Sequence, residues 1–247
     1  MRNFFTGCIY ILIVLLPGSC DQTKSSGEKL VYSQDFEEDD AVNEFLFAEP
    51  DKWHISADSL GNRFLEAIEK GSYEPPYRSP FLISLIDSIS VSDFVLEVDL
   101  MQKQVEHDCT GEKCVFCMHR DMCVFWAFQD SSHYYYAHIA RKGDNVAHQV
   151  HIVNDAPRTP ITVKRNEGVD WGINQWKHIK VVRSVKDTLL QIYFEDMETP
   201  VLEARDNTFI SGRIGFGSFD EAGKIDNIKL YSENVEITSQ GTFSSKN

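Results

Sequence analysis

The chain has 247 residues, of which 42% are hydrophobic and 25% are charged, and its formal net charge is −14. This balance is that of a globular protein with one large domain or two small ones. The acidic charge argues against a nucleic-acid partner, because phosphate binding requires clustered Lys and Arg. It also disfavours highly sulfated or uronate-rich polymers, unless a local basic patch intervenes.

The first 20 residues have the pattern of an export signal. Arg2 is followed by an apolar run, residues 9–16, which is too short to cross a bilayer as a lasting helix. The signal ends Leu-Pro-Gly-Ser-Cys at Cys20, which resembles a bacterial lipobox. We therefore expect an exported cell-envelope lipoprotein, periplasmic or on the outer-membrane surface, that is lipidated at Cys20 and touches the membrane only through this anchor. Simple secretion is the alternative.

Residues 21–29 are polar and predict a tether to a domain that spans residues 30–233. This domain is predicted as strands bounded by Gly, Pro, Asn or Asp, with almost no long helical periodicity. The predicted strands are residues 30–36, 53–56, 63–67, 94–102, 122–129, 134–140, 148–153, 177–183, 189–194, 201–205, 213–219 and 225–231. Such a pattern predicts an all-β protein with two antiparallel sheets packed as a β-sandwich. Residues 234–247 are polar and predict a loose tail.

Four cysteines form a tight cluster with the spacing C-x4-C-x2-C-x5-C, within and just after a predicted loop over residues 105–120: Cys109, Cys114, Cys117 and Cys123. An exported protein meets oxidising conditions, so two disulfides of undetermined pairing are expected. A structural zinc site and free thiols are the alternatives.

Residues 134–140 and 148–153 predict a β-hairpin with one unusually polar face, because Gly143-Asp144 between them is typical of a turn. Side chains of one parity share a face of a sheet. The polar face is then made of Tyr134, Tyr136, His138, Gln149, His151 and Val153. Such a face suits a wet groove for a polyhydroxylated ligand, although an ordinary solvent-facing strand surface is the alternative.

Two classes of chemistry fit this hairpin. In an enzyme, His138, His151 and Tyr136 would transfer protons, because a neutral imidazole accepts a proton near neutral pH and a phenol can return one. An arginine would steady a carboxylate or enolate-like oxygen, and the candidates are Arg78, Arg120 and Arg141. In a binding module, aromatic and polar side chains would contact sugar rings and hydroxyls, and the candidates are Tyr134, Gln149, Asn154, Asp155 and Arg141.

The remaining signals concern packing and metals. Trp126 is expected in the core and Trp176 at the start of a strand, whereas Trp53 and Trp171 are expected to be exposed. No cofactor is predicted. A structural Ca²⁺ at Asp220-Glu221 and Asp226 is an alternative to ordinary solvated turn acids.

Three segments in the C-terminal half carry a resemblance to a known family. They are N-Q-W-K-H-I-K-V at 174–181, G-R-I-G-F-G-S-F at 212–219 and I-D-N-I-K-L at 225–230. Together they resemble the concanavalin A-like lectin/glucanase jelly roll and, within it, the 3-keto-disaccharide hydrolases. The resemblance implies a ligand groove on the concave sheet.

That family has a strand resembling E-x-Q-I-x-D-N, whose nearest match is residues 149–155. Here Gln149, His151 and Asn154 stand where the family has Glu, Gln and Asp. An amide cannot replace an acid or a base, so the family's activity does not transfer simply. The sequence therefore predicts an exported protein that recognises or processes a glycan, with cleavage or elimination at a (3-keto-)glycoside bond as the possible reaction. A non-catalytic carbohydrate-binding lipoprotein and a structural cell-envelope lipoprotein are the alternatives.

Overall fold

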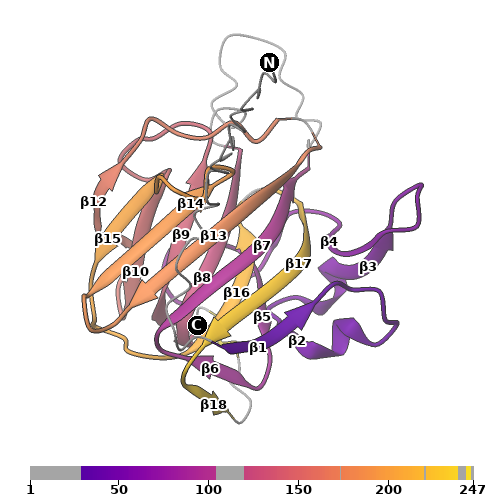
Figure 1. The fold of residues 1–247 in the computed structure, drawn as a ribbon, viewed down its shortest axis with the longest axis horizontal. Coiled ribbons are helices and arrows are strands. Elements are labelled where there is room, and N and C mark those ends of the chain that lie inside the picture. The colour runs from indigo at the N-terminus through magenta and orange to yellow at the C-terminus, as the bar shows by residue number, and fades with distance from the viewer. Residues whose placement is uncertain (1–28, 104–119, 173, 220, 239–242, 246–247) are drawn as a thin grey trace, which may run out of the picture.

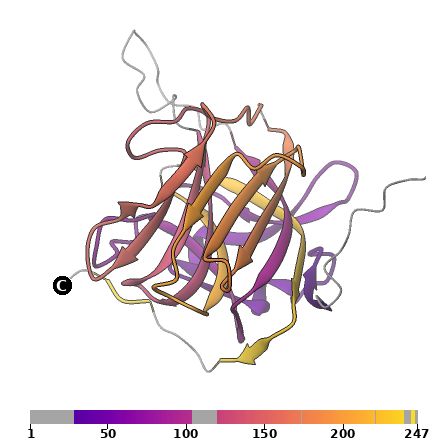
Figure 2. The ribbon, with the colours of Figure 1, turned by 60° about the vertical axis from the view of Figure 1, so that its left-hand side comes forward.

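The fold is a β-sandwich of two large antiparallel sheets, as the sequence predicted (Figures 1 and 2). The computed structural model describes residues 29–103, 120–172, 174–219, 221–238 and 243–245. The export signal with Cys20, most of the tether, and Cys109, Cys114 and Cys117 lie outside these residues. Every one of the predicted strands is present, with boundaries that differ by at most two residues.

The front sheet, which faces the viewer in Figure 1, has nine strands. In spatial order these are β12 (Thr162–Arg165), β15 (Leu202–Arg205), β14 (Leu189–Phe194), β13 (Trp176–Ser184), β7 (Phe94–Gln102), β17 (Gly223–Ser232), β4 (Arg63–Ala67) and β3 (Trp53–Ala57), with β1 (Lys29–Gln34) also paired to β17. Its inward side chains alternate with outward ones: Leu96, Val98 and Leu100 of β7 are buried between the sheets.

The back sheet has seven strands. They are β11 (Thr159–Pro160), β10 (Gln149–Asn154), β9 (His133–Ala140), β8 (Asp121–Asp130), β16 (Arg213–Ser218), β5 (Leu82–Ile86) and β2 (Phe45–Phe47). A short pair, β6 (Ile89–Val91) with β18 (Val235–Ile237), and two 3₁₀ turns, Ala41–Glu44 and Pro50–Lys52, complete the elements. β18 corrects the prediction of a loose tail, because Val235 pairs with Val91.

The back sheet is buried on both faces. Its inward face joins the main core, whereas its outward face joins a second apolar cluster that includes Phe125, Phe128 and Tyr134. A strand with two buried faces cannot alternate between apolar and polar residues, which explains why β8 is an almost continuous apolar run. Gly217 of β16 helps this packing, because a Cβ there would lie 1.8 Å from the Leu82 carbonyl oxygen.

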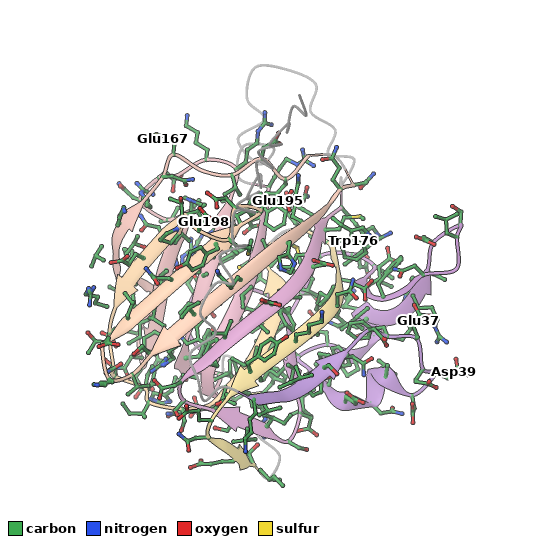
Figure 3. All side chains as sticks on the ribbon, viewed as in Figure 1. Glu37, Asp39, Glu167, Trp176, Glu195 and Glu198 are labelled. Atoms are coloured by element: carbon green, nitrogen blue, oxygen red, sulfur yellow. The ribbon has the colours of Figure 1, made fainter. Side chains whose placement is uncertain are left out.

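The outward face of the front sheet is different, because it is largely polar. The Glu195 carboxylate, labelled in Figure 3, accepts the backbone N–H of His178 at 2.8 Å, and the His178 ring contacts Asp99 at 2.7 Å. Trp176 lies on this side, half-buried against the edge of the Phe64 ring at 5.6 Å. This matches its predicted place at a strand start.

Two tryptophan predictions are wrong. Trp53 and Trp171 are 5% and 1% exposed, although turn-like neighbours predicted exposure. Trp171 packs edge-on against Phe194 at 5.0 Å and donates its indole N–H to the Ile139 carbonyl at 3.1 Å, so its polar atom is satisfied inside the core. Trp126 is fully buried, as predicted.

Candidate functional site

The hairpin formed by β9 and β10 has the predicted register. Gln149 pairs with His138, and His151 pairs with Tyr136. The third pair joins Val153 to Tyr134, so all six residues of the predicted polar face point to the same side of the back sheet. This side is the outward face, away from the main core.

The prediction that this face lines a wet groove is wrong. Tyr134, Tyr136 and His151 are 0% exposed, and His138 and Gln149 are also buried. Aromatic residues from distant parts of the chain cover the face, and we call them the roof: Tyr73, Tyr77, Phe81, Phe219 and Phe243.

Phe219 is the central residue of the roof. Its ring centroid lies 5.2 Å from that of His138, 6.2 Å from that of Tyr136 and 5.6 Å from that of Phe81. It follows β16 directly, so the register of β16 against β8 holds it above the hairpin.

The segment Phe243–Ser245 closes another part of the roof. The Phe243 ring packs edge-on against Phe128 at 5.7 Å and Tyr73 at 5.9 Å. The Ser244 N–H donates to Ser131 Oγ at 2.9 Å, and the Tyr73 hydroxyl donates to the Ser244 carbonyl. This contact fixes the segment on the sheet by both apolar and polar groups.

Beneath the roof lies a group of polar side chains that we call the polar cluster: Asp121, Tyr136, His138, Gln149, His151 and Arg158. His138 and Asp121 form an ion pair through Nε2 and a carboxylate oxygen, with both side chains about 5% exposed or less. His138 Nδ1 lies 3.0 Å from the Val146 carbonyl oxygen. Both ring nitrogens of His138 are therefore in contact with oxygen atoms of the protein.

His151 is the least satisfied member of the polar cluster. Its ring stacks on Tyr136 at 4.9 Å between centroids and 14° between planes. Neither ring nitrogen has a well-aligned hydrogen bond with a described residue, although the Gln149 backbone interacts with the ring and favours its protonated form. Burial, then the nearby charges of His138 and Arg158, lower the pKa of His151 to about 2, so this imidazole is neutral near pH 7.

Arg158 enters the polar cluster from the turn between β10 and β11. Its guanidinium carbon lies 4.2 Å from the centroid of the Phe219 ring, and its Nη1 lies 3.4 Å from the Tyr136 hydroxyl. Burial raises the pKa of Tyr136 well above its usual value, although Arg158 acts in the opposite direction. Tyr136 therefore meets Arg158 as a neutral phenol.

Sequence reasoning missed Arg158 and Asp121. Arg158 lies in the turn that follows Asn154-Asp155 and leads to Pro160, which pairs with His151. Because the chain reverses here, the Arg158 side chain reaches Tyr136 on the hairpin face. Asp121 stands directly before seven apolar residues, 122–128, and a carboxylate at the start of such a run was the available signal.

The other candidate residues do not join the polar cluster. Asn154 and Asp155 are exposed, and Asp155 contacts the His133 ring at 3.1 Å. Arg141 and Arg78 are exposed. Arg120 donates through Nε to Gln102 at 2.9 Å, on the front sheet. Of the predicted site residues, the structure gathers only those of the hairpin face.

Cys123 is a buried free thiol, so the prediction that all four clustered cysteines form two disulfides is wrong. It lies directly across from His138, and burial raises the pKa of its thiol well above the usual value. The other three cysteines lie outside the described residues.

The acidic residues that the sequence offered for calcium have other partners where they are described. Asp226 accepts from the Asn62 amide at 3.0 Å, and Glu221 accepts from the Gln102 amide at 2.9 Å. Asp220 lies outside the described residues. Across the ranges that the structure covers, no group of three or more His, Cys, Asp or Glu side chains could hold a metal ion. Within the same ranges, no helix is long and apolar enough to cross a membrane.

No protein-family model matches this chain, and no curated protein matches it. Solved structures do match. A carbohydrate-binding module, CBM66 from Bacillus subtilis, has a TM-score of 0.52 at 17% identity, over 76% of this chain and 96% of that one. A protein of unknown function with a galectin-like fold, also from Bacillus subtilis, has a TM-score of 0.52 at 8% identity, over 85% of this chain and 100% of the other.

A third structure is the GH43 protein BlXynB from Bacillus licheniformis, in a mutant form. It has a TM-score of 0.51 at 10% identity, over 81% of this chain and 39% of that protein. At such low identities these similarities establish the fold, a lectin-like jelly roll, and not an activity.

Proposed function

We propose that the protein binds a carbohydrate through the polar cluster on the outward face of its back sheet. The observation that carries this proposal is the buried His151, whose two ring nitrogens have no well-aligned hydrogen bond with a described residue. Buried polar atoms are nearly always paired, so an unpaired imidazole beside Gln149 and Tyr136 points to a ligand that supplies the missing partners. A sugar supplies hydroxyl groups that both donate and accept.

The fold supports the same ligand class. One of the similar structures, CBM66, is named as a carbohydrate-binding module. The polar cluster also has the composition of a sugar site, because aromatic rings stand beside amide, imidazole and guanidinium groups. Access to His151 requires part of the roof to move, and we expect a ligand to enter at the half-buried Arg158, which lies over the buried Phe219 ring.

Recognition is favoured over catalysis because two of the predicted acid–base groups are poorly tuned for proton transfer. An effective general base has a pKa near the working pH. The pKa of His151 is lowered to about 2, and that of Tyr136 is raised well above its usual value. Both groups are therefore suited to hydrogen bonding in their neutral forms.

A second function, glycan processing, is favoured by one observation, the buried pair of His138 and Asp121. A carboxylate that orients an imidazole is the common arrangement for a histidine acid–base group. Asp121 is the one carboxylate in the polar cluster, so the two-carboxylate route of most glycosidases does not fit it. Elimination or hydrolysis at a (3-keto-)glycoside bond, if it takes place, would depend on His138.

The test is binding of the full chain to a panel of oligosaccharides, measured by pull-down and calorimetry, with reducing ends and absorbance near 235 nm followed in parallel. We expect retention of at least one glycan by the wild type and its loss in His151→Leu. His178→Gln, on the opposite sheet, is the matched control and should bind normally. Turnover lost in His138→Gln would establish processing instead. Wild-type protein that neither binds nor converts any glycan would contradict both functions and favour a structural envelope role.

The expected location of the protein in the cell envelope is a separate proposal. Lipidation at Cys20 predicts that the mature protein partitions with membranes and begins with an acylated cysteine. Mass spectrometry of the mature N-terminus checks this. A cleaved chain without a lipid would indicate simple secretion.

A further inference from the structure

The charge around Arg158 is the second informative feature of the polar cluster. The side chain is half-buried, and the hydrogen-bond and ring partners of its guanidinium among the described residues are neutral groups, the Tyr136 hydroxyl and the Phe219 ring. In the part of the chain that the structure describes, no carboxylate forms an ion pair with it. Asp121, the carboxylate of the polar cluster, is paired with His138.

The other neighbours cannot balance this charge. The pKa of His151 is lowered and those of Tyr136 and Cys123 are raised, so all three are neutral near pH 7. Asp121 is engaged by His138 and forms no ion pair with Arg158. Arg158 is therefore left without an ion-pair partner among the described residues, within a protein that has 38 Asp and Glu but only 24 Lys and Arg.

A guanidinium in such a place selects a particular partner. Its planar fork matches a carboxylate and can form two parallel hydrogen bonds to it. The groups next to it, the Tyr136 hydroxyl, His151 and Gln149, suit sugar hydroxyls rather than further charge. A ligand that satisfies all of them carries one carboxylate next to several hydroxyls, as a uronic acid does.

We propose that the carbohydrate bound by this protein contains a uronic acid residue, whose carboxylate pairs with Arg158. This inference rests on the proposed function and adds the substrate class. The ring hydroxyls of the same residue would face His151 and Gln149 once the Arg158–Phe219 layer shifts.

The net charge of the protein further restricts which acidic glycans it can bind. At −14, the protein repels dense polyanions over a distance of about a Debye length. One local cation attracts one carboxylate, so isolated or chain-end uronic acids within an otherwise neutral glycan should bind better than polyuronates. This also reconciles the site with the overall acidity of the chain.

The test compares glucuronate- and galacturonate-terminated oligosaccharides with their neutral glucose and galactose counterparts, by calorimetry on the full chain. We expect the wild type to bind an acidic member at least about tenfold more tightly than its neutral partner, since charge-assisted hydrogen bonds are worth that much. Arg158→Gln should remove this preference and leave weak neutral binding. Arg205→Gln removes the same charge from the front sheet and should keep the preference.

Each outcome has a distinct meaning. Equal affinity for acidic and neutral sugars would overturn the uronic acid proposal while the proposed function stands. No binding of any sugar would end the proposed function itself. Stronger binding of sulfated or phosphorylated sugars than of uronates would assign Arg158 to another anion. Circular dichroism of Arg158→Gln, and the Arg158 side-chain NMR signal with and without ligand, separate loss of contact from loss of fold.

Discussion

His151 is the residue whose position is hardest to explain by stability. A buried polar group without a hydrogen bond costs about 1–3 kcal/mol relative to a satisfied one. His151 is 0% exposed, and both of its ring nitrogens lack a well-aligned partner among the described residues. A purely structural role would be filled better by an apolar side chain of similar size, so His151 is the residue that most directly supports the proposed binding function.

His151→Leu should therefore raise the free energy of unfolding, by about 1–2 kcal/mol, because the desolvation cost disappears. Urea denaturation at pH 7 measures this change. His138→Leu is the contrasting variant, since it leaves the buried Asp121 without its partner and should cost about 3–5 kcal/mol. Destabilisation by His151→Leu of similar size would show that this ring is a structural group with partners in solution.

At the scale of elements, the hairpin of β9 and β10 shows what the sequence could predict. Strict alternation and the turn residues predicted both its register and which side chains share a face, and the pairing of His151 with Tyr136 agrees. The positions of the other strands could be predicted for the same reason, because the alternation of apolar and polar residues is visible within each short segment of sequence.

The covering of that face was not predictable, because it is made by residues far away in sequence. Tyr73, Phe219 and Phe243 meet above the hairpin, and no local pattern links the three segments. Burial then changed the chemistry, since it lowers the pKa of His151 and removes the wet groove. The arginine of the site was also misjudged, because its place depends on how the turn before β11 folds back.

Phe243→Ala should loosen one part of the roof without unfolding the sheets. The side chain is half-buried, so its loss should cost about 1–2 kcal/mol. Hydrogen exchange should become faster at the Ser244 amide, which donates to Ser131, and stay slow in β8 and β9. Ile237→Ala, at a side chain that is 89% exposed, is the control and should change stability by less than about 0.5 kcal/mol. Equal acceleration throughout β8 would mean that the segment supports the whole sheet.

For the whole molecule, the histidines predict how stability depends on pH. The pKa of His151 is lowered to about 2 and that of His148 to about 4. Below pH 6.5 these two histidines therefore bind protons in the unfolded chain but stay neutral in the folded protein. The free energy of unfolding should therefore fall as the pH drops below about 6.5. His133 and His178 have raised pKa values, so their contribution is complete below 6.5 and is lost as the pH rises through their folded values.

The acid effect should be the larger one, because both lowered histidines are fully buried, whereas both raised ones are partly exposed and screened by water. Chemical denaturation between pH 4 and pH 9 should show maximal stability near neutral pH and a steep decline on the acid side. In His151→Leu this decline should be shallower. A flat profile down to pH 4 would contradict the neutral, buried state of these rings.

The order of strands also governs when this protein can fold. β17 lies between β7 and β4 in the front sheet, and β16 lies between β8 and β5 in the back sheet, yet both are among the last strands in the chain. During synthesis, a nascent chain that lacks them exposes open edges on several apolar strands, which is the condition in which β proteins aggregate. Neither sheet can close until residues 213–232 have left the ribosome, so the sandwich should form late and almost all at once, and the growing chain should depend on chaperones until then.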